Sequence, residues 1–353
     1  MRALGIAGTA KNTGKTTTTA ALIEEIKKNS LSLGLTSIGF DGEEIDNITG
    51  LPKPRLKVKK GCILAVAENC LKVSSAEIDI LENSQIKTPL GKIVFGKVTQ
   101  EGLVVVAGPN KSRDLHVALD KFKKMKCDMV IVDGALNRLS PMGEVDGLII
   151  ATGAAKTPDI DQLVEETQQL VKIFKIDQSE ERIDWPNCAT ININGKKTIL
   201  NFKSLIDRSS LEEIKGILKK GAGYIYIPGL ISQTYFAELL KLENIKNKTL
   251  VCKNAIKFLL GGNLHEVVSN LKQVKKAGLN LQVIKKIPVL AVTINPFYPA
   301  YRYNNKYSAE FVDKKVLYKK MVQALDIPVY NVMEPVHKKE LFKTVFNKLF
   351  VCN

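Results

Sequence analysis

The stretch from Leu4 to Thr19, LGIAGTAKNTGKTTTT, constrains this chain more than any other. A short apolar run leads into a loop of small residues from Gly8 to Gly14, and Lys15-Thr16-Thr17 then opens a segment with helical spacing of apolar residues. A strand, a glycine-containing loop, Gly-Lys-Thr and a helix are the parts of a phosphate-binding loop, or P-loop. In such a loop the backbone N–H groups converge on phosphate oxygens. The sequence therefore predicts a P-loop.

The residue types in this loop have chemical reasons. Lys15 is expected to contact the β- and γ-phosphates of a nucleotide, and the hydroxyl of Thr16 to ligate Mg²⁺. The other predicted nucleotide-binding residues of the loop are Gly8, Thr9, Lys11, Asn12, Thr13, Gly14 and Thr17. A Gly/Thr-rich loop that binds nothing is the alternative, which the preceding strand and the following helix disfavour. The predicted cofactors are ATP and Mg²⁺.

Two acidic residues are predicted to complete the site. The apolar run Met129–Val132 ends at Asp133, the arrangement of a Walker B strand, whose carboxylate reaches Mg²⁺ or positions the attacking water. Asp41 ends the second predicted strand and is the other candidate, although Asp-Gly is equally a turn signal. The predicted catalytic residues are thus Lys15, Asp133 and Asp41, and the predicted metal ligands are Thr16, Asp41 and Asp133.

Beyond the P-loop, apolar strand-like runs alternate with amphipathic helical segments. This order predicts an α/β fold with a doubly wound, mostly parallel sheet of the P-loop NTPase type and a second α/β region. Residues 1–157 are predicted to form the nucleotide-binding domain, with a β-rich insertion or sheet edge at 51–102. Residues 158–353 are predicted to form a carboxyl-terminal α/β domain, with the junction near the polar stretch 178–186.

Composition narrows the functional classes. No run of 18 or more apolar residues is present, and the sequence starts directly with a strand, so neither a membrane span nor a signal peptide is expected. The six Cys and three His are scattered without C-x-x-C spacing, which favours a reducing cytoplasm over a disulfide or zinc framework. The net charge of +16 comes from short lysine groups, interpreted as solvated faces or as a surface for an acidic partner. No nucleic-acid-binding module accompanies this charge, so a nucleic-acid partner is not expected.

The sequence GTAKNTGKTT has Thr9 where the common G-x-x-x-x-G-K-[ST] pattern has its first Gly, and so resembles the dethiobiotin synthetase branch of P-loop proteins. The MinD-type pattern would place a second signature Lys at position 10, which is Ala10 here. Together with SIGFDGE, VIVDGALNR and AVTINP, the loop is similar to the smaller subunit of the lysine or ornithine aminomutase reactivase. This resemblance implies a chaperone-like ATPase that works with a MutS-like ATPase subunit. Its partner would be a cobalamin- and pyridoxal-phosphate-dependent aminomutase of amino-acid fermentation.

Two features near the carboxyl terminus bear on recognition. The apolar run 287–294 ends at Asn295 and resembles the base-recognition strand of dethiobiotin synthetase-like proteins, which implies that Asn295 binds the nucleobase. In that case the fold closes on itself around a large insertion, whereas the alternative is an ordinary Asn-Pro turn. The segment Phe297–Tyr307 holds four of the nine Tyr, which suits contact with a ligand or a partner, or a loop pinned by buried Tyr.

Two other functional classes stay open from the sequence. One is a ligase or kinase of the dethiobiotin synthetase type, whose ATP turnover needs a small acceptor such as a carboxylate. The other is a regulatory nucleotide-binding protein that hydrolyses ATP slowly under every condition.

Overall fold

The chain folds into two units, each with its own β-sheet. The computed structural model describes residues 1–39, 56–135, 139–180, 186–219, 221, 223–302 and 306–351. The first unit comprises Met1–Thr167 and Val289–Asn353, and the second comprises Gln168–Pro288. Asp41 lies outside the described residues.

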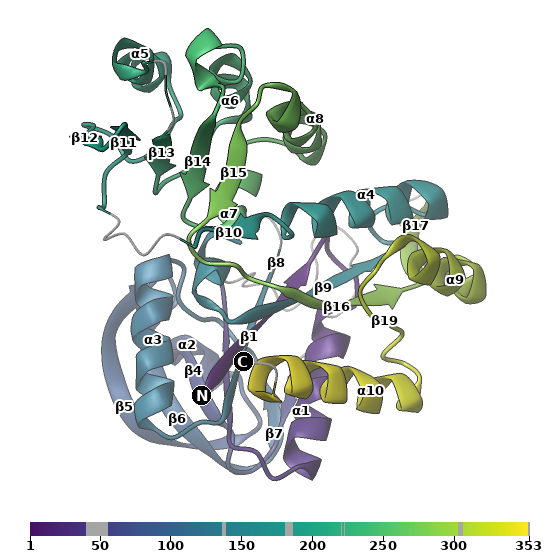
Figure 1. Ribbon diagram of the computed structural model, residues 1–353. Helices are drawn as coiled ribbons and strands as arrows, with labels where there is room; N and C mark the ends of the chain where they lie inside the picture. The colour runs from purple at the N-terminus through teal and green to yellow at the C-terminus, as the bar shows by residue number, and fades with distance from the viewer. Residues whose placement is uncertain are drawn as a thin grey trace. The chain divides into compact units, whose positions relative to one another are not determined.

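The first unit is built on a nine-stranded sheet with the order β19-β16-β9-β1-β8-β2-β4-β6-β5 (Figure 1). These strands are β1 (Arg2–Gly8), β2 (Leu33–Ser37), β4 (Ile63–Ala67), β5 (Glu77–Thr88), β6 (Gly91–Gln100), β8 (Met129–Ala135), β9 (Gly147–Gly153), β16 (Val289–Asn295) and β19 (Val329–Tyr330). The strands from β19 to β4 are parallel, whereas β6 pairs antiparallel with both β4 and β5. A large, mostly parallel sheet confirms the predicted fold class.

Helices cover both faces of this sheet. They are α1 (Lys15–Lys28), α2 (Glu68–Lys72), α3 (Ser112–Lys124), η2 (Ser140–Glu144), α4 (Ile160–Ile173), α9 (Lys314–Ala324), α10 (Pro335–Phe346) and η4 (Asn347–Val351). In Figure 1, the part of α4 that belongs to the first unit, up to Thr167, lies on the opposite side of the central strands from α1 and α10. The central strands β8 and β9 are buried at almost every position, which explains their continuous apolar runs.

The apolar face of helix α3 packs against the sheet. Its buried positions Leu115, Ala118, Leu119 and Phe122 follow the spacing of one helical face. The ring of Phe122 meets Phe95 of β6 edge-to-face at 5.5 Å between centroids. The same periodicity that predicts this helix in the sequence therefore supplies its contact with the sheet.

The two units have other bounds than the predicted boundary between residues 157 and 158, and they match the alternative in which the fold closes on itself around a large insertion. Strand β16 pairs with β9, and β19 pairs with β16, so residues 289–353 belong to the first unit and not to a domain that begins at residue 158. The physical reason is that β9 is buried along its whole length and needs a neighbour on both edges. Leu290, Ala291 and Val292 of β16 are themselves buried and supply that neighbour.

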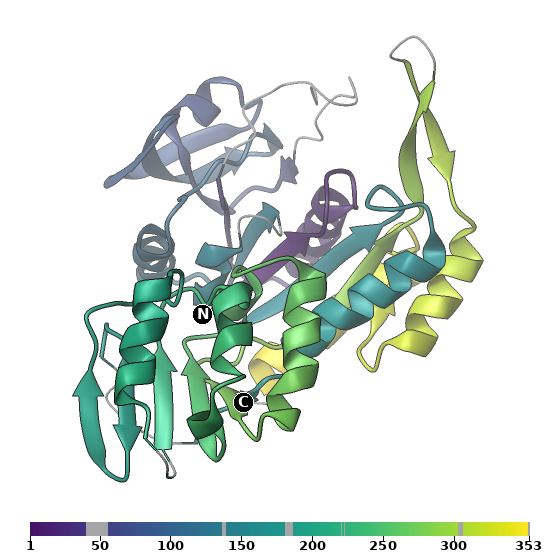
Figure 2. The ribbon, with the colours of Figure 1, turned by 90° about the horizontal axis from the view of Figure 1, so that it is seen from above.

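The region predicted to be β-rich contributes an antiparallel edge to the first sheet. Strands β5 and β6 form that edge, and the short strands β3 (Leu56–Val58) and β7 (Gly102–Val104) pair antiparallel beside it. The aromatic segment that follows Asn295 is also an antiparallel pair, β17 (Phe297–Arg302) with β18 (Lys306–Phe311). Figure 2 shows this hairpin projecting from the first unit.

The second unit is a six-stranded sheet with the order β10-β15-β14-β13-β11-β12. Its elements are β10 (Asp177–Gln178), β11 (Thr190–Ile193), β12 (Lys196–Ile199), α5 (Arg208–Ile217), β13 (Gly223–Ile227), α6 (Gln233–Leu239), η3 (Glu243–Ile245), β14 (Lys248–Cys252), α7 (Ala255–Leu259), α8 (Leu264–Lys276) and β15 (Asn280–Val283). Strands β13, β14, β15 and β10 are parallel, and β11 and β12 are antiparallel. Among the described residues of both units, no helix has the length and apolar character needed to cross a membrane.

Candidate functional site

The predicted P-loop lies at the carboxyl edge of the nine-stranded sheet. Strand β1 lies between β8 and β9. The strands β2, β4, β5, β6 and β8 lie on one side of it, and the later strands β9, β16 and β19 lie on the other. Such a point of reversal is where open α/β sheets bind ligands. The carboxyl ends of β1, β8, β9 and β16 bring Gly8, Asp133, Thr152 and Asn295 to this edge.

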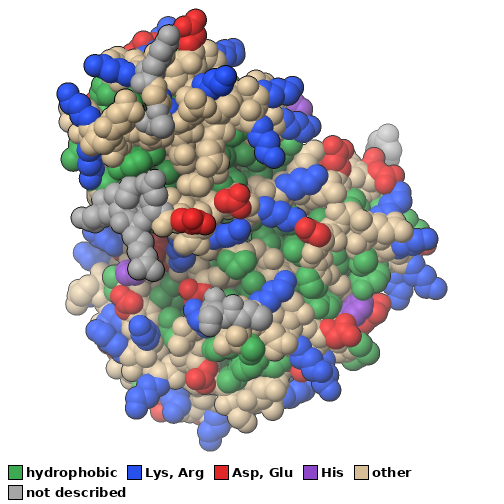
Figure 3. Space-filling model, viewed as in Figure 1, with side chains coloured by type: hydrophobic (Ala, Val, Ile, Leu, Met, Phe, Trp, Pro, Cys, Tyr) green, Lys and Arg blue, Asp and Glu red, His purple; other side chains and the backbone are tan. Residues whose placement is uncertain are grey.

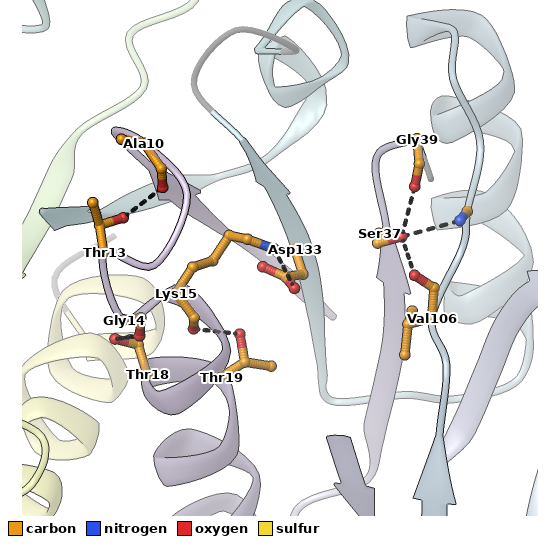
Figure 4. Close-up of polar contacts among 11 residues, drawn as sticks. Ala10, Thr13, Gly14, Lys15, Thr18, Thr19, Ser37, Gly39, Val106 and Asp133 are labelled. Carbon is orange, nitrogen blue, oxygen red and sulfur yellow. Dashed lines mark hydrogen bonds and ion pairs between the residues drawn. The ribbon is translucent and has the colours of Figure 1, made fainter. Parts of the chain in front are cut away.

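The loop between β1 and α1 has the backbone shape of an anion-binding turn. Asn12 and Gly14 have φ angles of 61° and 87°, in the left-handed region that favours Asn and Gly. The side chain of Thr13 is buried between them, and its hydroxyl donates to the carbonyl of Ala10 at 2.9 Å (Figure 4). Such alternation of backbone conformation turns successive N–H groups toward one concavity.

Thr9 anchors the start of the loop. Its N–H donates to the carbonyl of Ala151 at 2.9 Å, and its hydroxyl donates to the hydroxyl of Thr152 at 3.0 Å. Both donors of Thr9 are therefore engaged with the end of β9, which gives this position a role in fixing the loop. Two further predicted phosphate-binding residues, Lys11 and Thr17, are exposed.

Lys15 and Asp133 form the central contact of the site (Figure 4). The Nζ of Lys15, the first residue of α1, donates to Oδ2 of Asp133 on β8 at 2.7 Å. The Lys15 side chain is 28% exposed and that of Asp133 only 8%. Among the described residues, no group donates a hydrogen bond to the buried Oδ1 of Asp133. An unpaired buried carboxylate oxygen is costly, and it fits a cation ligand.

Thr16 and Asp133 fit a Mg²⁺ site in which phosphate completes the ligand set. The hydroxyls of Thr18 and Thr19 donate back to the carbonyls of Gly14 and Lys15, whereas no hydrogen bond involves the Thr16 hydroxyl among the described residues. No cluster of three or more His, Cys, Asp or Glu occurs in the part of the chain that the structure describes. Mg²⁺ commonly takes one or two protein oxygens and completes its shell with water and substrate phosphates.

Asn295 is brought against the P-loop from β16. Its Nδ2 donates to the carbonyl of Asn12 at 2.8 Å, and its Oδ1 accepts from the N–H of Phe297 at 3.2 Å. The prediction placed this residue near the nucleotide, and the structure places it beside the loop itself. Contact between Asn295 and a nucleobase stays a prediction.

Sequence reasoning missed the hydroxyl residues that tie these strand ends together. The buried hydroxyls of Thr18 and Thr293 lie 2.8 Å apart and join α1 to β16. The hydroxyl of Ser37, at the end of β2, donates to the carbonyl of Val106 at 2.8 Å and accepts from Gly108 (Figure 4). A signal was present for Thr293 and Thr152, which are isolated hydroxyls near the ends of apolar runs, but not for Thr18, which is one of four consecutive threonines.

Comparisons with known proteins give no family for this chain. No protein-family model matches the sequence, and no curated protein matches it. Among solved structures, the MinC:MinD cell division protein complex of Aquifex aeolicus is 10% identical, with 83% of this chain and 81% of that chain covered and a TM-score of 0.29. The pNOB8 ParA bound to nonspecific DNA is 11% identical over 98% of both chains, with a TM-score of 0.30.

Cobyrinic acid a,c-diamide synthase of Mycobacterium smegmatis, solved with an ATP analog and magnesium, is 14% identical. The match covers 82% of this chain and 99% of that chain, with a TM-score of 0.28. At TM-scores of 0.30 or less, none of these likenesses bears on the chemistry of the site.

The unequal burial of Lys15 and Asp133 predicts unequal effects on stability. Lys15→Met leaves a buried carboxylate without its partner, and we expect a loss of about 3 kcal/mol in the free energy of unfolding. Asp133→Asn leaves a lysine that solvent still reaches, so we expect a loss of about 1 kcal/mol or less. The measurement is urea unfolding followed by circular dichroism.

Lys27→Met, on an exposed position of the same helix, is the matched control and is expected to unfold like the wild type. Millimolar Mg²⁺ alone is expected to recover part of the loss in Lys15→Met by binding the Asp133 carboxylate, which has lost its lysine partner. Equal losses for Lys15→Met and Asp133→Asn would contradict the assigned burial.

Proposed function

We propose that this protein is a Mg²⁺-dependent P-loop NTPase that binds ATP at the loop between β1 and α1. The observation that carries the proposal is the contact between Lys15 and the half-paired Asp133 at the carboxyl edge of the sheet. Lysine on the first turn of a helix and aspartate at the end of the neighbouring strand are two of the charged groups that P-loop proteins use, together with Mg²⁺, in triphosphate hydrolysis.

The residues of the site have separate roles in this chemistry. Lys15 exchanges its partner Asp133 for the phosphate oxygens and offsets charge that develops there. Thr16 and Asp133 would hold Mg²⁺, and the ion supplies further charge neutralisation at the phosphates when it is bound. The carboxylate of Asp133, once released by Lys15, accepts a hydrogen bond from the attacking water and orients it.

The loop supplies the remaining contacts through its backbone. The left-handed Gly14 places the first N–H groups of α1 at the mouth of the loop, where the partial positive charge of the helix terminus favours an anion. No acidic residue lies in the first turn of α1. The helix terminus is therefore available to a bound phosphate.

Two substitutions are expected to separate binding from hydrolysis. Lys15→Met should weaken Mg²⁺-ATP binding by about a hundredfold or more, because it removes a charge-assisted contact to phosphate. Asp133→Asn should retain ATP binding but lower the hydrolysis rate by about a hundredfold or more, because the water loses its orienting carboxylate. Calorimetric titration and steady-state phosphate release measure the two effects.

Lys27→Met again serves as the control, with affinity and rate expected to equal those of the wild type. Unchanged ATP affinity in a natively folded Lys15→Met protein would rule out the P-loop assignment. Full hydrolysis by Asp133→Asn would return Asp133 to a structural role.

We further propose that hydrolysis serves a protein partner. Support comes from the β17–β18 hairpin, where the Phe311 side chain is 65% exposed and contacts Phe297 edge-to-face at 5.8 Å. An isolated two-stranded hairpin is marginally stable in water, so a partner surface would add to its stability. On the face shown in Figure 3, Lys and Arg side chains are interspersed with Asp and Glu. Nucleic-acid-binding surfaces are instead marked by clustered Lys and Arg, so this face gives no support for a nucleic-acid partner.

The resemblance described above would make the partner a cobalamin-dependent aminomutase with its MutS-like ATPase companion. A protein that remodels its partner binds it differently in the ATP and ADP states, since a ligand shifts an equilibrium only through differential affinity. Slow basal hydrolysis that rises when the partner complex is added is the behaviour expected of such a subunit.

Phe311→Ser is expected to reduce this stimulation severalfold without changing ATP affinity, because it removes an apolar contact from the hairpin. The control is Ile199→Ser, at a position of β12 that is 61% exposed, and it should respond like the wild type. The measurement is steady-state phosphate release with and without the partner complex. Stimulation by a small carboxylic or amino acid alone, with a phosphorylated product, would instead assign the protein to the ligase or kinase class.

A further inference from the structure

We propose that Asn295 is a positioning residue that holds the P-loop in its phosphate-binding shape and does not recognise the nucleobase. The proposal rests on nucleotide binding at this loop, as proposed above. It follows from what the side-chain amide of Asn295 contacts and from how rigidly its own backbone is held.

Both ends of the Asn295 amide have backbone partners. The Nδ2 donates to a carbonyl, that of Asn12, and Oδ1 accepts from an N–H, that of Phe297. Because a carbonyl only accepts and an N–H only donates, these two partners fix the orientation of the amide. The side chain therefore bridges the middle of the P-loop and the first residue of β17.

The backbone of Asn295 is fixed to the sheet. Asn295 is the last residue of β16, pairs with Gly153 of β9, and accepts a hydrogen bond from the N–H of Ala154 at 2.9 Å. A Cβ on Gly153 would lie 2.3 Å from the carbonyl oxygen of Asn295, so this approach of the two strands requires glycine. The amide thus projects from a backbone that the sheet holds through pairing, a hydrogen bond and close packing.

The P-loop residues that Asn295 contacts have backbone conformations that need support. Asn12 has a left-handed backbone, a conformation that asparagine tolerates better than most residues but less readily than glycine, so a contact that holds its peptide helps to keep the loop in shape. Gly14 is also left-handed, and a Cβ there would lie 3.2 Å from the Cβ of Asn295. One side chain therefore meets the loop on both sides of Thr13.

Strand β16 holds the same region at a second point. The hydroxyl of Thr293, two residues before Asn295, contacts the hydroxyl of Thr18 in α1, and Thr18 in turn donates to the carbonyl of Gly14. The loop and the first turn of α1 are thus both attached to β16. Loss of the Asn295 amide would free the Asn12 peptide while leaving the helix attached.

The two possible roles of Asn295, positioning the loop and recognising the base, predict different effects of its substitution on the affinity for different ligands. A residue that recognises a base affects only ligands that carry that base. A residue that shapes the loop affects every ligand that places phosphates there, including one without a base. Inorganic tripolyphosphate is therefore the ligand that separates the two roles.

The experiment measures the dissociation constants of wild type and Asn295→Ala for ATP, GTP and inorganic tripolyphosphate, each with Mg²⁺, by calorimetry. We expect Asn295→Ala to weaken all three by the same factor, about tenfold, the effect of losing one hydrogen bond that orders the loop. The matched control is Asn331→Ala, whose asparagine follows the neighbouring strand β19 and accepts from Met333 instead of contacting the loop.

Asn295→Ser, which also lacks the Nδ2 donor, gives the same comparison if Asn295→Ala does not fold. Weakened binding of ATP alone, or of both nucleotides with unchanged tripolyphosphate affinity, would overturn the proposal in favour of base recognition. Unchanged affinity for all three ligands would overturn it in favour of a purely structural role. Failure of the wild type to bind any of the three ligands would overturn the proposed function as well. The wild-type measurement therefore distinguishes failure of the proposed function from failure of the positioning role.

Discussion

Lys15 meets Asp133 because a parallel sheet places the ends of neighbouring strands side by side. In the ladder between β1 and β8, Ile6 is level with Asp133, so the loop that follows β1 passes directly above the carboxylate. The first residue of α1 then has one buried negative charge within reach, at 2.7 Å. The rest of the site depends on this pair, since it sets where a phosphate can compete for the lysine and where a cation can meet the aspartate.

The strands on the other side of β1 keep the loop in place. Thr9 is attached to β9 through Ala151 and Thr152, and the loop and α1 are attached to β16 through Asn295 and Thr293. Strand β16 reaches this position only after the whole second unit has been traversed in the sequence. The P-loop is thus shaped partly by residues almost 300 positions away, which links its conformation to the base of the β17–β18 hairpin.

The parts of this site that follow local patterns were predictable from the sequence. The Gly-Lys-Thr turn after an apolar run identifies the loop, and an apolar run that ends in aspartate identifies Asp133, because each pattern depends on neighbouring residues alone. The return of β16 to the first sheet was implied only by the resemblance of the strand that ends at Asn295, since no local pattern shows which sheet edge stays open after the intervening residues fold. The contact between Asn295 and Asn12 depends in turn on that pairing, so no local pattern announces it.

Hydrogen–deuterium exchange with and without saturating Mg²⁺-ATP tests most directly whether the carboxyl edge of the first sheet is the nucleotide site. The account predicts slower exchange in peptides that cover the loop from Thr9 to Thr19 and the end of β8, because bound phosphates engage the N–H groups of the loop. Peptides from the second unit should exchange at the same rate in both conditions. Unchanged exchange in the loop, with protection confined to residues 223–288 of the second unit, would contradict the account.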